Sequence, residues 1–161
     1  MPEIKVVDFP KTYMAGMLYH GDNKDNEIPG LWNILMQREA EIARRDTSAP
    51  IAFGINIMGP EFEDAHVFDY IAGFPVTDTL VDLPEGMGQF EIPEGKYAVI
   101  TCPNLASLAK AYDAIYNRWL PESDYQLDLS FGNFCFELYS EEFNPPAGSE
   151  KLYIYVPVTK K

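Results

Sequence analysis

Apolar residues alternate with other residues along several short segments of the chain, a pattern typical of β-strands. Residues 3–19 predict an extended segment with an irregularity at Pro10, because proline disrupts the regular pairing of a strand. Four further strands and a last one are predicted from the same alternation, over residues 50–59, 66–73, 96–102, 133–143 and 151–158.

Two other segments have apolar residues at helical spacing instead. The first predicts a helix from about Pro29, a favoured first-turn proline, to Arg45. The second predicts a helix from Leu105 to about Leu120, where Pro121 biases the preceding residue away from helix. Between the halves, residues 75–95 are rich in proline, glycine and acidic residues and predict a connection.

Each half of the chain therefore has the order strand, helix, strand, strand. The recurrence predicts one domain, residues 1–161, made of two pseudo-repeats at about residues 3–75 and 90–158. We expect an α+β fold in which the two units form antiparallel sheet with helices on one face and a ligand groove on the other.

Glu137 is the anomalous residue of the predicted strands, because it lies in the apolar, aromatic run 133–143. A carboxylate there is costly to desolvate unless a donor or a cation accompanies it. Alternation puts Cys135, Glu137 and Tyr139 on one face. If the helices cover Phe136, Leu138, Leu152, Ile154 and Val156, the open face carries Glu137 together with Tyr139, Tyr153 and Tyr155, and Phe68, Tyr70 and Tyr97 could join it.

A carboxylate surrounded by aromatic rings is suited to bind a cation, since charge and ring quadrupole act together. The alternative interpretation is a solvated sheet face that uses tyrosine for its strand propensity. Trp119 belongs to the helical stripe, which makes it a core residue first and a ligand wall second. The group of His66, Glu61, Glu63 and Asp64 is a weak metal candidate because acidic turns are usually solvated, so we expect no metal and no cofactor.

Charge and segment composition narrow the classes of function. The formal charge is −13, which repels phosphate backbones, so we expect no direct nucleic-acid binding. No apolar run is long enough to span a bilayer, and the start lacks the pattern of a signal peptide. We therefore expect a cytoplasmic protein without a membrane partner, in which Cys102 and Cys135 stay reduced.

Several segments in order resemble the GyrI-like small-molecule-binding domain, which also forms the effector-binding part of multidrug-responsive transcription regulators. The segments are Phe90–Ile100, Ala111–Tyr112, Arg118–Tyr125, Phe136–Tyr139 and Leu152–Val158, with a looser match at Gly16, Gly54 and Phe68–Gly73. Pro103–Leu105 departs from the usual family pattern. No helix-turn-helix or basic segment precedes these residues, so the resemblance is to a stand-alone member.

The resemblance implies a groove between the halves where aromatic rings and a strand glutamate, matching Glu137, hold lipophilic and often cationic ligands. Some relatives hydrolyse cyclopropane-containing natural products, so a detoxifying hydrolase with Glu137 as general acid or base is an alternative. Gyrase-inhibiting members imply a third class, a protein-interaction role. The ligand-binding candidates are Glu137, Tyr139, Tyr155, Tyr153, Tyr70, Tyr97, Trp119 and Phe68.

Overall fold

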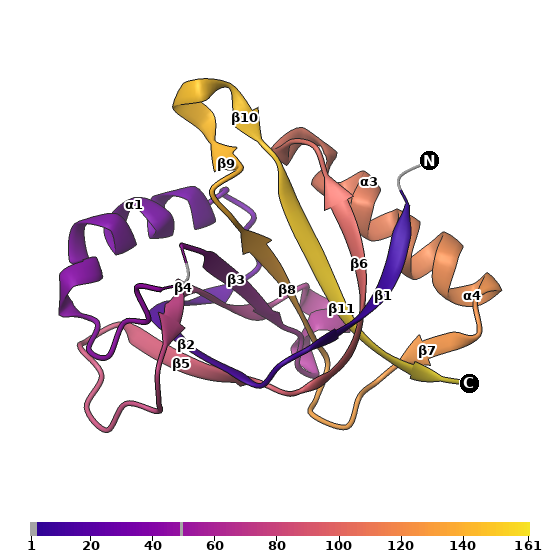
Figure 1. The fold of residues 1–161 in the computed structure, drawn as a ribbon, viewed down its shortest axis with the longest axis horizontal. Helices are drawn as coiled ribbons and strands as arrows, with labels where there is room; N and C mark the ends of the chain where they lie inside the picture. The colour runs from indigo at the N-terminus through magenta and orange to yellow at the C-terminus, as the bar shows by residue number, and fades with distance from the viewer. Residues whose placement is uncertain (1–2, 49) are drawn as a thin grey trace.

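A nine-stranded antiparallel sheet forms the main element of the protein, for which a computed structural model describes residues 3–48 and 50–161 (Figure 1). Its strands, in the order in which they lie side by side, are β1 (Ile4–Phe9), β6 (Gly95–Cys102), β11 (Leu152–Lys160), β8 (Phe134–Tyr139), β3 (Ala52–Ile57), β4 (Phe68–Val76), β2 (Thr12–Gly21) and β5 (Met87–Ile92), with β7 (Tyr125–Leu127) paired to the end of β11. A small hairpin of β9 (Phe143–Asn144) and β10 (Ser149–Glu150) projects beside it.

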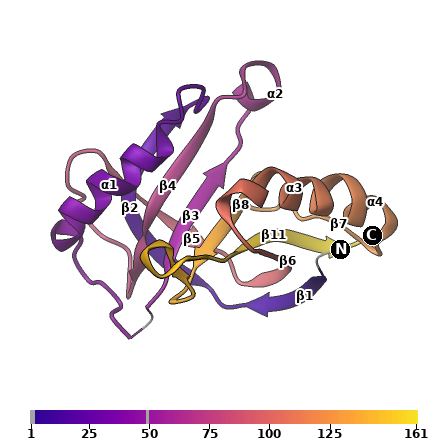
Figure 2. The ribbon, with the colours of Figure 1, turned by 90° about the horizontal axis from the view of Figure 1, so that it is seen from above.

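Two helical segments lie on the same side of this sheet, as Figure 2 shows. The first is α1 (Ile28–Arg38), which is followed by the 3-10 turn η1 (Glu39–Glu41). The second is continuous through η2 (Leu105–Ser107), α3 (Leu108–Asp113), the π-helical turn η3 (Ala114–Trp119) and α4 (Leu120–Glu122). The short helix α2 (Glu61–Ala65) connects β3 to β4.

The order of strands is symmetrical about the central pair, β8 and β3. On one side lie β8, β11 and β6, and on the other lie β3, β4 and β2, each set accompanied by its own helix. The two outermost strands are exchanged: β1 from the start of the chain pairs with β6, and β5 pairs with β2. The halves therefore meet at β3 and β8, where Gly54 lies opposite Glu137.

Apolar side chains are buried on both faces of the sheet. On the helix face, α3 packs over Ala98, Ile100, Leu152, Ile154 and Val156, and Leu31 and Leu35 of α1 pack over Ala72 and Phe74. The opposite face carries an aromatic cluster in which Phe136 lies against Phe53 and stacks on Tyr155. Because both faces are covered, the interior of β8 is buried throughout.

The expected fold class, α+β with an antiparallel sheet and few helices, is confirmed, and several element boundaries differ. The first helix ends at Arg38, well before Arg45, and Arg44 adopts a left-handed backbone conformation with φ of 57°. The second helical segment continues through Pro121 and ends at Glu122, two residues beyond the predicted end at Leu120. Strands β5 and β7 were not predicted, because their segments lack a long alternating pattern.

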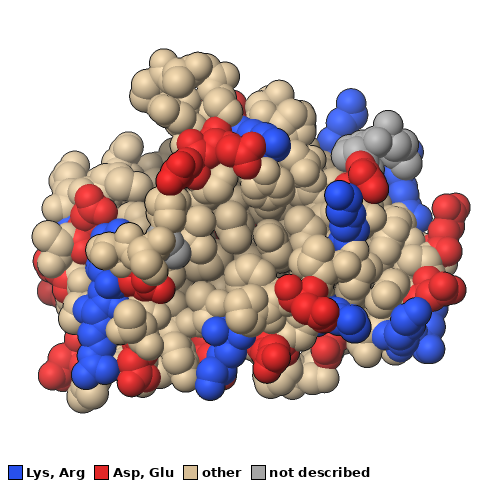
Figure 3. Space-filling view, viewed as in Figure 1, with Lys and Arg blue, Asp and Glu red and all other residues tan. Residues whose placement is uncertain are grey.

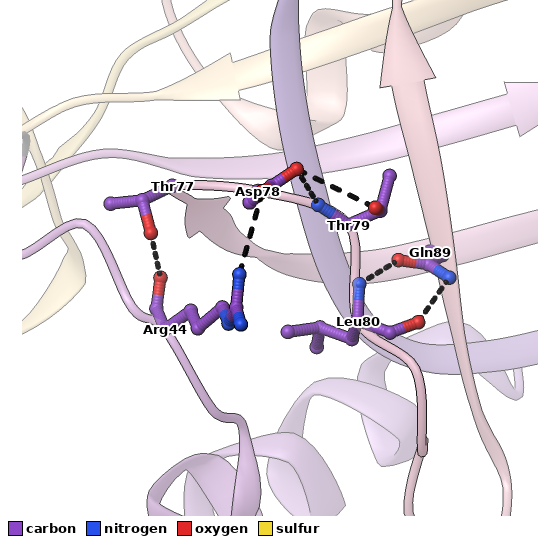
Figure 4. Close-up of polar contacts among 6 residues, drawn as sticks. All are labelled: Arg44, Thr77, Asp78, Thr79, Leu80 and Gln89. Carbon is purple, nitrogen blue, oxygen red and sulfur yellow. Dashed lines mark hydrogen bonds and ion pairs between the residues drawn. The ribbon is translucent and has the colours of Figure 1, made fainter.

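The connection between β4 and β5 is held by side-chain contacts with backbone groups (Figure 4). The Gln89 amide accepts a hydrogen bond from the backbone N–H of Leu80 at 2.8 Å and donates one to its carbonyl at 3.0 Å. Asp78 accepts from the Thr79 N–H at 2.8 Å and forms an ion pair with Arg44 at 3.4 Å. These bonds fix the connection against β5 and against the segment after α1.

Candidate functional site

Glu137 lies buried at the centre of the sheet, on its helix face, with 7% of its surface exposed. The Tyr112 hydroxyl donates a hydrogen bond to its Oε2 at 2.5 Å, and the Tyr139 hydroxyl donates one to its Oε1 at 2.7 Å. The Asn56 amide nitrogen lies 3.3 Å from Oε2 as a third donor. These three contacts compensate much of the cost of burying a carboxylate.

The central strands set the arrangement around this carboxylate. Gly54 faces Glu137 across the β3–β8 pair, and Asn56 faces Tyr70 across the β3–β4 pair. A side chain at Gly54 would overlap the Tyr70 hydroxyl, and its Cβ would lie 3.1 Å from Glu137 Oε1. The missing side chain of Gly54 therefore makes the room in which the Tyr70 hydroxyl and the carboxylate lie close together.

Each helix contributes one aromatic residue to the same place. Tyr112 comes from α3. Trp32 comes from α1, where its indole Nε1 donates to the Tyr70 hydroxyl at 3.1 Å and its ring packs edge-to-face on Tyr139 at 5.2 Å. We name Trp32, Asn56, Tyr70, Tyr112, Glu137 and Tyr139 the Glu137 cluster; it joins the two halves of the chain and both helices.

The hydroxyl groups of this cluster remain protonated far into the alkaline range. Burial, and after it the charge of Glu137, raises the pKa of Tyr70, Tyr112 and Tyr139. The same two causes raise the pKa of the Cys135 thiol to about 12. The tyrosines are thus hydrogen-bond donors to the carboxylate at neutral pH, and the thiol is neutral.

The prediction that Tyr153 and Tyr155 share the face of Glu137 is wrong. In the observed register Ile154 lies opposite Glu137, whereas Tyr155 lies opposite Phe136. A shift of register by one residue exchanges the faces of a whole strand, and the sequence did not fix the register of β11 against β8. Phe136 and Leu138, which were expected under the helices, therefore lie on the other face, and Glu137 lies on the helix face instead of opposite to it.

The remaining candidates lie at different distances from the carboxylate. Tyr70 and Tyr139 belong to the Glu137 cluster. Phe68 lies two residues before Tyr70 on β4, where it packs against Tyr19 with the ring centres 6.1 Å apart. Tyr97 is buried on the opposite face and donates to the Pro93 carbonyl at 2.5 Å. Trp119 stacks on Tyr125 at 5.8 Å, as part of the core under the second helix.

Three members of the Glu137 cluster were not among the sequence candidates. Asn56 is the one amide on the small-residue face of the strand 50–59, and that was a usable signal. Tyr112 and Trp32 follow the apolar stripes of their helices, so periodicity identified them as core residues. The hydrogen bonds that their polar atoms make can be recognised only once the positions of the strands beneath the helices are known.

We next consider metal sites, membrane-spanning helices and surface hollows outside the Glu137 cluster, in the described part of the chain. No three His, Cys, Asp or Glu side chains there are arranged to hold a metal ion. No helix of residues 3–48 and 50–161 has the length and apolar character needed to cross a membrane. A surface hollow of about 410 Å³ lies between α3 and the end of β6, lined by residues such as Thr101, Lys110 and Arg118. It does not include Glu137.

Charged side chains lie mainly around the edge of the face shown in Figure 3, and acidic ones gather beside the β9–β10 hairpin. Glu142, which directly precedes β9 in the chain, accepts hydrogen bonds from Lys151 at 2.8 Å and from the Tyr153 hydroxyl. The formal charge of −13 makes the field around the molecule attractive to cations.

The family described as GyrI-like small molecule binding domain matches residues 2–159. The chain belongs to this family. A relative, the transcriptional regulator BrlR of Pseudomonas aeruginosa, is 31% identical over 156 residues. The alignment covers 96% of this chain and 54% of BrlR, so the chain spans about half the length of that relative.

Two solved structures share the fold of this GyrI-like domain. The C-terminal domain of EcmrR superposes with a TM-score of 0.74 at 14% identity, covering 100% of this chain and 99% of that domain. SAV2435 bound to tetraphenylphosphonium superposes with a TM-score of 0.70 at 15% identity, covering 98% of this chain and 94% of SAV2435. At these identities the superpositions establish the fold.

Proposed function

We propose that this GyrI-like domain binds lipophilic cations beside Glu137, on the helix face of the sheet. The observation that carries the proposal is a buried carboxylate that no lysine, arginine or histidine of the described residues neutralises by an ion pair. Its hydrogen-bond donors are neutral hydroxyl and amide groups, which leave the negative charge uncompensated.

The aromatic residues of the Glu137 cluster supply the rest of a cation site. Trp32 and Tyr139 are partly exposed and in contact with each other, and Phe143 packs on Tyr139 with the ring centres 4.9 Å apart. Aromatic faces attract cations by about 0.5–2 kcal/mol each, and the uncompensated carboxylate adds a longer-range attraction. The tetraphenylphosphonium complex of SAV2435, which has the same fold, supports this class of ligand.

Titration with tetraphenylphosphonium, followed by tryptophan fluorescence, tests the proposal. Of the two tryptophans in the chain, Trp32 belongs to the Glu137 cluster and reports on the site, while Trp119 stacks on Tyr125. We expect saturable binding by the wild type and about tenfold to hundredfold weaker binding by Glu137→Gln, because a charge in a partly desolvated site is lost.

Glu91→Gln is the matched control, since it removes the same charge from an exposed position on β5. Its affinity is expected to equal that of the wild type. Equal affinity in Glu137→Gln and wild type would contradict the proposed site, and absence of binding to the wild type would contradict the proposed ligand class.

In the hydrolase alternative, Glu137 would have to act as a general acid or base in addition to attracting the ligand. A general base needs a free lone pair that can accept a proton from water, and both oxygens of this carboxylate already accept hydrogen bonds from the protein. This arrangement favours holding a ligand over activating water. Incubation of bound ligands with the protein, followed by mass spectrometry, separates the two functions, because a hydrolase would yield a product larger by one water or split in two.

A further inference from the structure

The hydrogen bonds inside the Glu137 cluster leave little capacity to accept another one. A carboxylate has about four acceptor positions on its two oxygens. Tyr112, Tyr139 and Asn56 donate to three of them, and the Tyr70 hydroxyl and Oε1 both lie beside Gly54. The charge of Glu137 is therefore available to a ligand, but its lone pairs are largely occupied.

Two of the hydroxyl oxygens in the Glu137 cluster, those of Tyr70 and Tyr112, accept contacts as well. Tyr70 Oη accepts a hydrogen bond from the Trp32 indole at 3.1 Å. Tyr112 Oη receives a longer contact of 3.5 Å from the Asn56 amide. A ligand that enters with an N–H donor would lose its bonds to water and find few acceptors to replace them, a loss that is larger for a charged donor.

We propose that the site selects permanently charged cations without N–H groups, such as quaternary ammonium and phosphonium ions, over protonated amines of similar size. The inference rests on the proposed function and specifies its ligand class. An ion whose charge is covered by carbon groups is recognised through the field of Glu137 and the faces of Trp32 and Tyr139, and it makes no demand on the occupied lone pairs.

A matched pair of ligands tests the selectivity: dibenzyldimethylammonium, which has no N–H, and dibenzylmethylammonium, which has one. Both carry a single positive charge at neutral pH, and affinities are measured by isothermal titration calorimetry. We expect the wild type to bind the quaternary ion at least about tenfold more tightly. The extra methyl group alone accounts for about fourfold, so the decisive comparison is the ratio of the two affinities between variants.

Tyr112→Phe removes one donor from Glu137 Oε2 and frees a lone pair. We expect the preference for the quaternary ion to fall in this variant to about the fourfold that the extra methyl group accounts for, because the ammonium N–H gains an acceptor. Tyr116→Phe is the control: it removes a hydroxyl from the next turn of the same helical segment, where that buried hydroxyl has no hydrogen-bond partner among the described residues. Its ratio is expected to stay at the wild-type value.

The outcomes separate this inference from the proposed function. Equal affinity of the wild type for the two ions, or an unchanged ratio in Tyr112→Phe, would overturn the selectivity while leaving cation binding in place. Binding of neither ion, nor of tetraphenylphosphonium, would overturn both. If Tyr112→Phe does not fold, Tyr139→Phe removes the donor to Oε1 and gives the same test.

Discussion

Substitution of Gly54 by alanine gives a direct test of how the Glu137 cluster is packed. The new Cβ would overlap the Tyr70 hydroxyl and lie 2.8 Å from Tyr70 Cζ and 3.1 Å from Glu137 Oε1. Tyr70 is only 2% exposed and its hydroxyl accepts from Trp32, so its ring has little room to move aside. Overpacking of this kind costs about 1–3 kcal/mol, and loss of the Trp32 hydrogen bond adds about 1 kcal/mol.

Replacing glycine also restricts the unfolded chain, which returns about 0.4–1 kcal/mol. We therefore expect Gly54→Ala to lower the free energy of unfolding by about 1–3 kcal/mol, measured by urea denaturation. Gly95→Ala is the control, because nothing lies within 4 Å of a Cβ built there on β6. Gly54→Ala with Tyr70→Phe should recover part of the loss. Wild-type stability in Gly54→Ala would refute the close packing at Glu137.

Three further predictions concern charge, ionisation and the opposite face of the sheet. The pKa values of Tyr70, Tyr112 and Tyr139 are raised in the folded protein, so the unfolded chain releases these protons first as the pH rises. The free energy of unfolding should therefore fall above about pH 10. Thermal melts between neutral and alkaline pH check this, and a melting temperature that rises with pH would contradict it. Tyr155→Leu should lower the free energy of unfolding by about 1–2 kcal/mol through loss of its stack on Phe136, yet leave the cation affinity measured by calorimetry unchanged. A loss of affinity would indicate that the cation binds on the face opposite to the helices and would contradict the proposed site. Because the formal charge is −13, association rates of cations in stopped-flow experiments should fall with added salt, and equal rates at low and high salt would refute steering by this field.

The fold could be predicted to a large extent because its signals are local. Alternation along the segments around Phe53 and Phe136 and helical spacing around Leu35 and Ile115 gave the elements, and their recurrence gave the order of elements in each half. Strand β5 was missed because Gly88 and the surrounding acidic, glycine-rich residues obscure its short pattern. The exchange of β1 and β5 between the halves leaves no local signal in the sequence.

The candidate site was only partly predictable, because pairing between distant strands decides it. Alternation correctly put Glu137 and Tyr139 on one face, since both belong to one strand. The choice between Ile154 and Tyr155 as the neighbour on β11 depends on register, and grouping Phe136 and Leu138 with the aliphatic residues of β11 under the helices gave the wrong answer. Trp32 joins the cluster through its indole nitrogen, a contact that no helical pattern contains.

Glu137 is the residue through which we connect the family relationship with the geometry of the structure. GyrI-like domains are described as small-molecule-binding, and this chain buries a carboxylate where its two halves and both helices come together. Two separate proposals rest on Glu137: that its charge attracts cations, and that its occupied lone pairs restrict which cations fit. Variants of Glu137 test the first, and variants of Tyr112 test the second.

A crystal structure of the protein with tetraphenylphosphonium would test the central claim most directly. The account predicts that the phosphonium ion lies on the helix face, against Trp32 and Tyr139 and within a few ångströms of the Glu137 carboxylate. An ion bound on the opposite face against Tyr153 and Tyr155, or in the surface hollow beside Lys110, would contradict it.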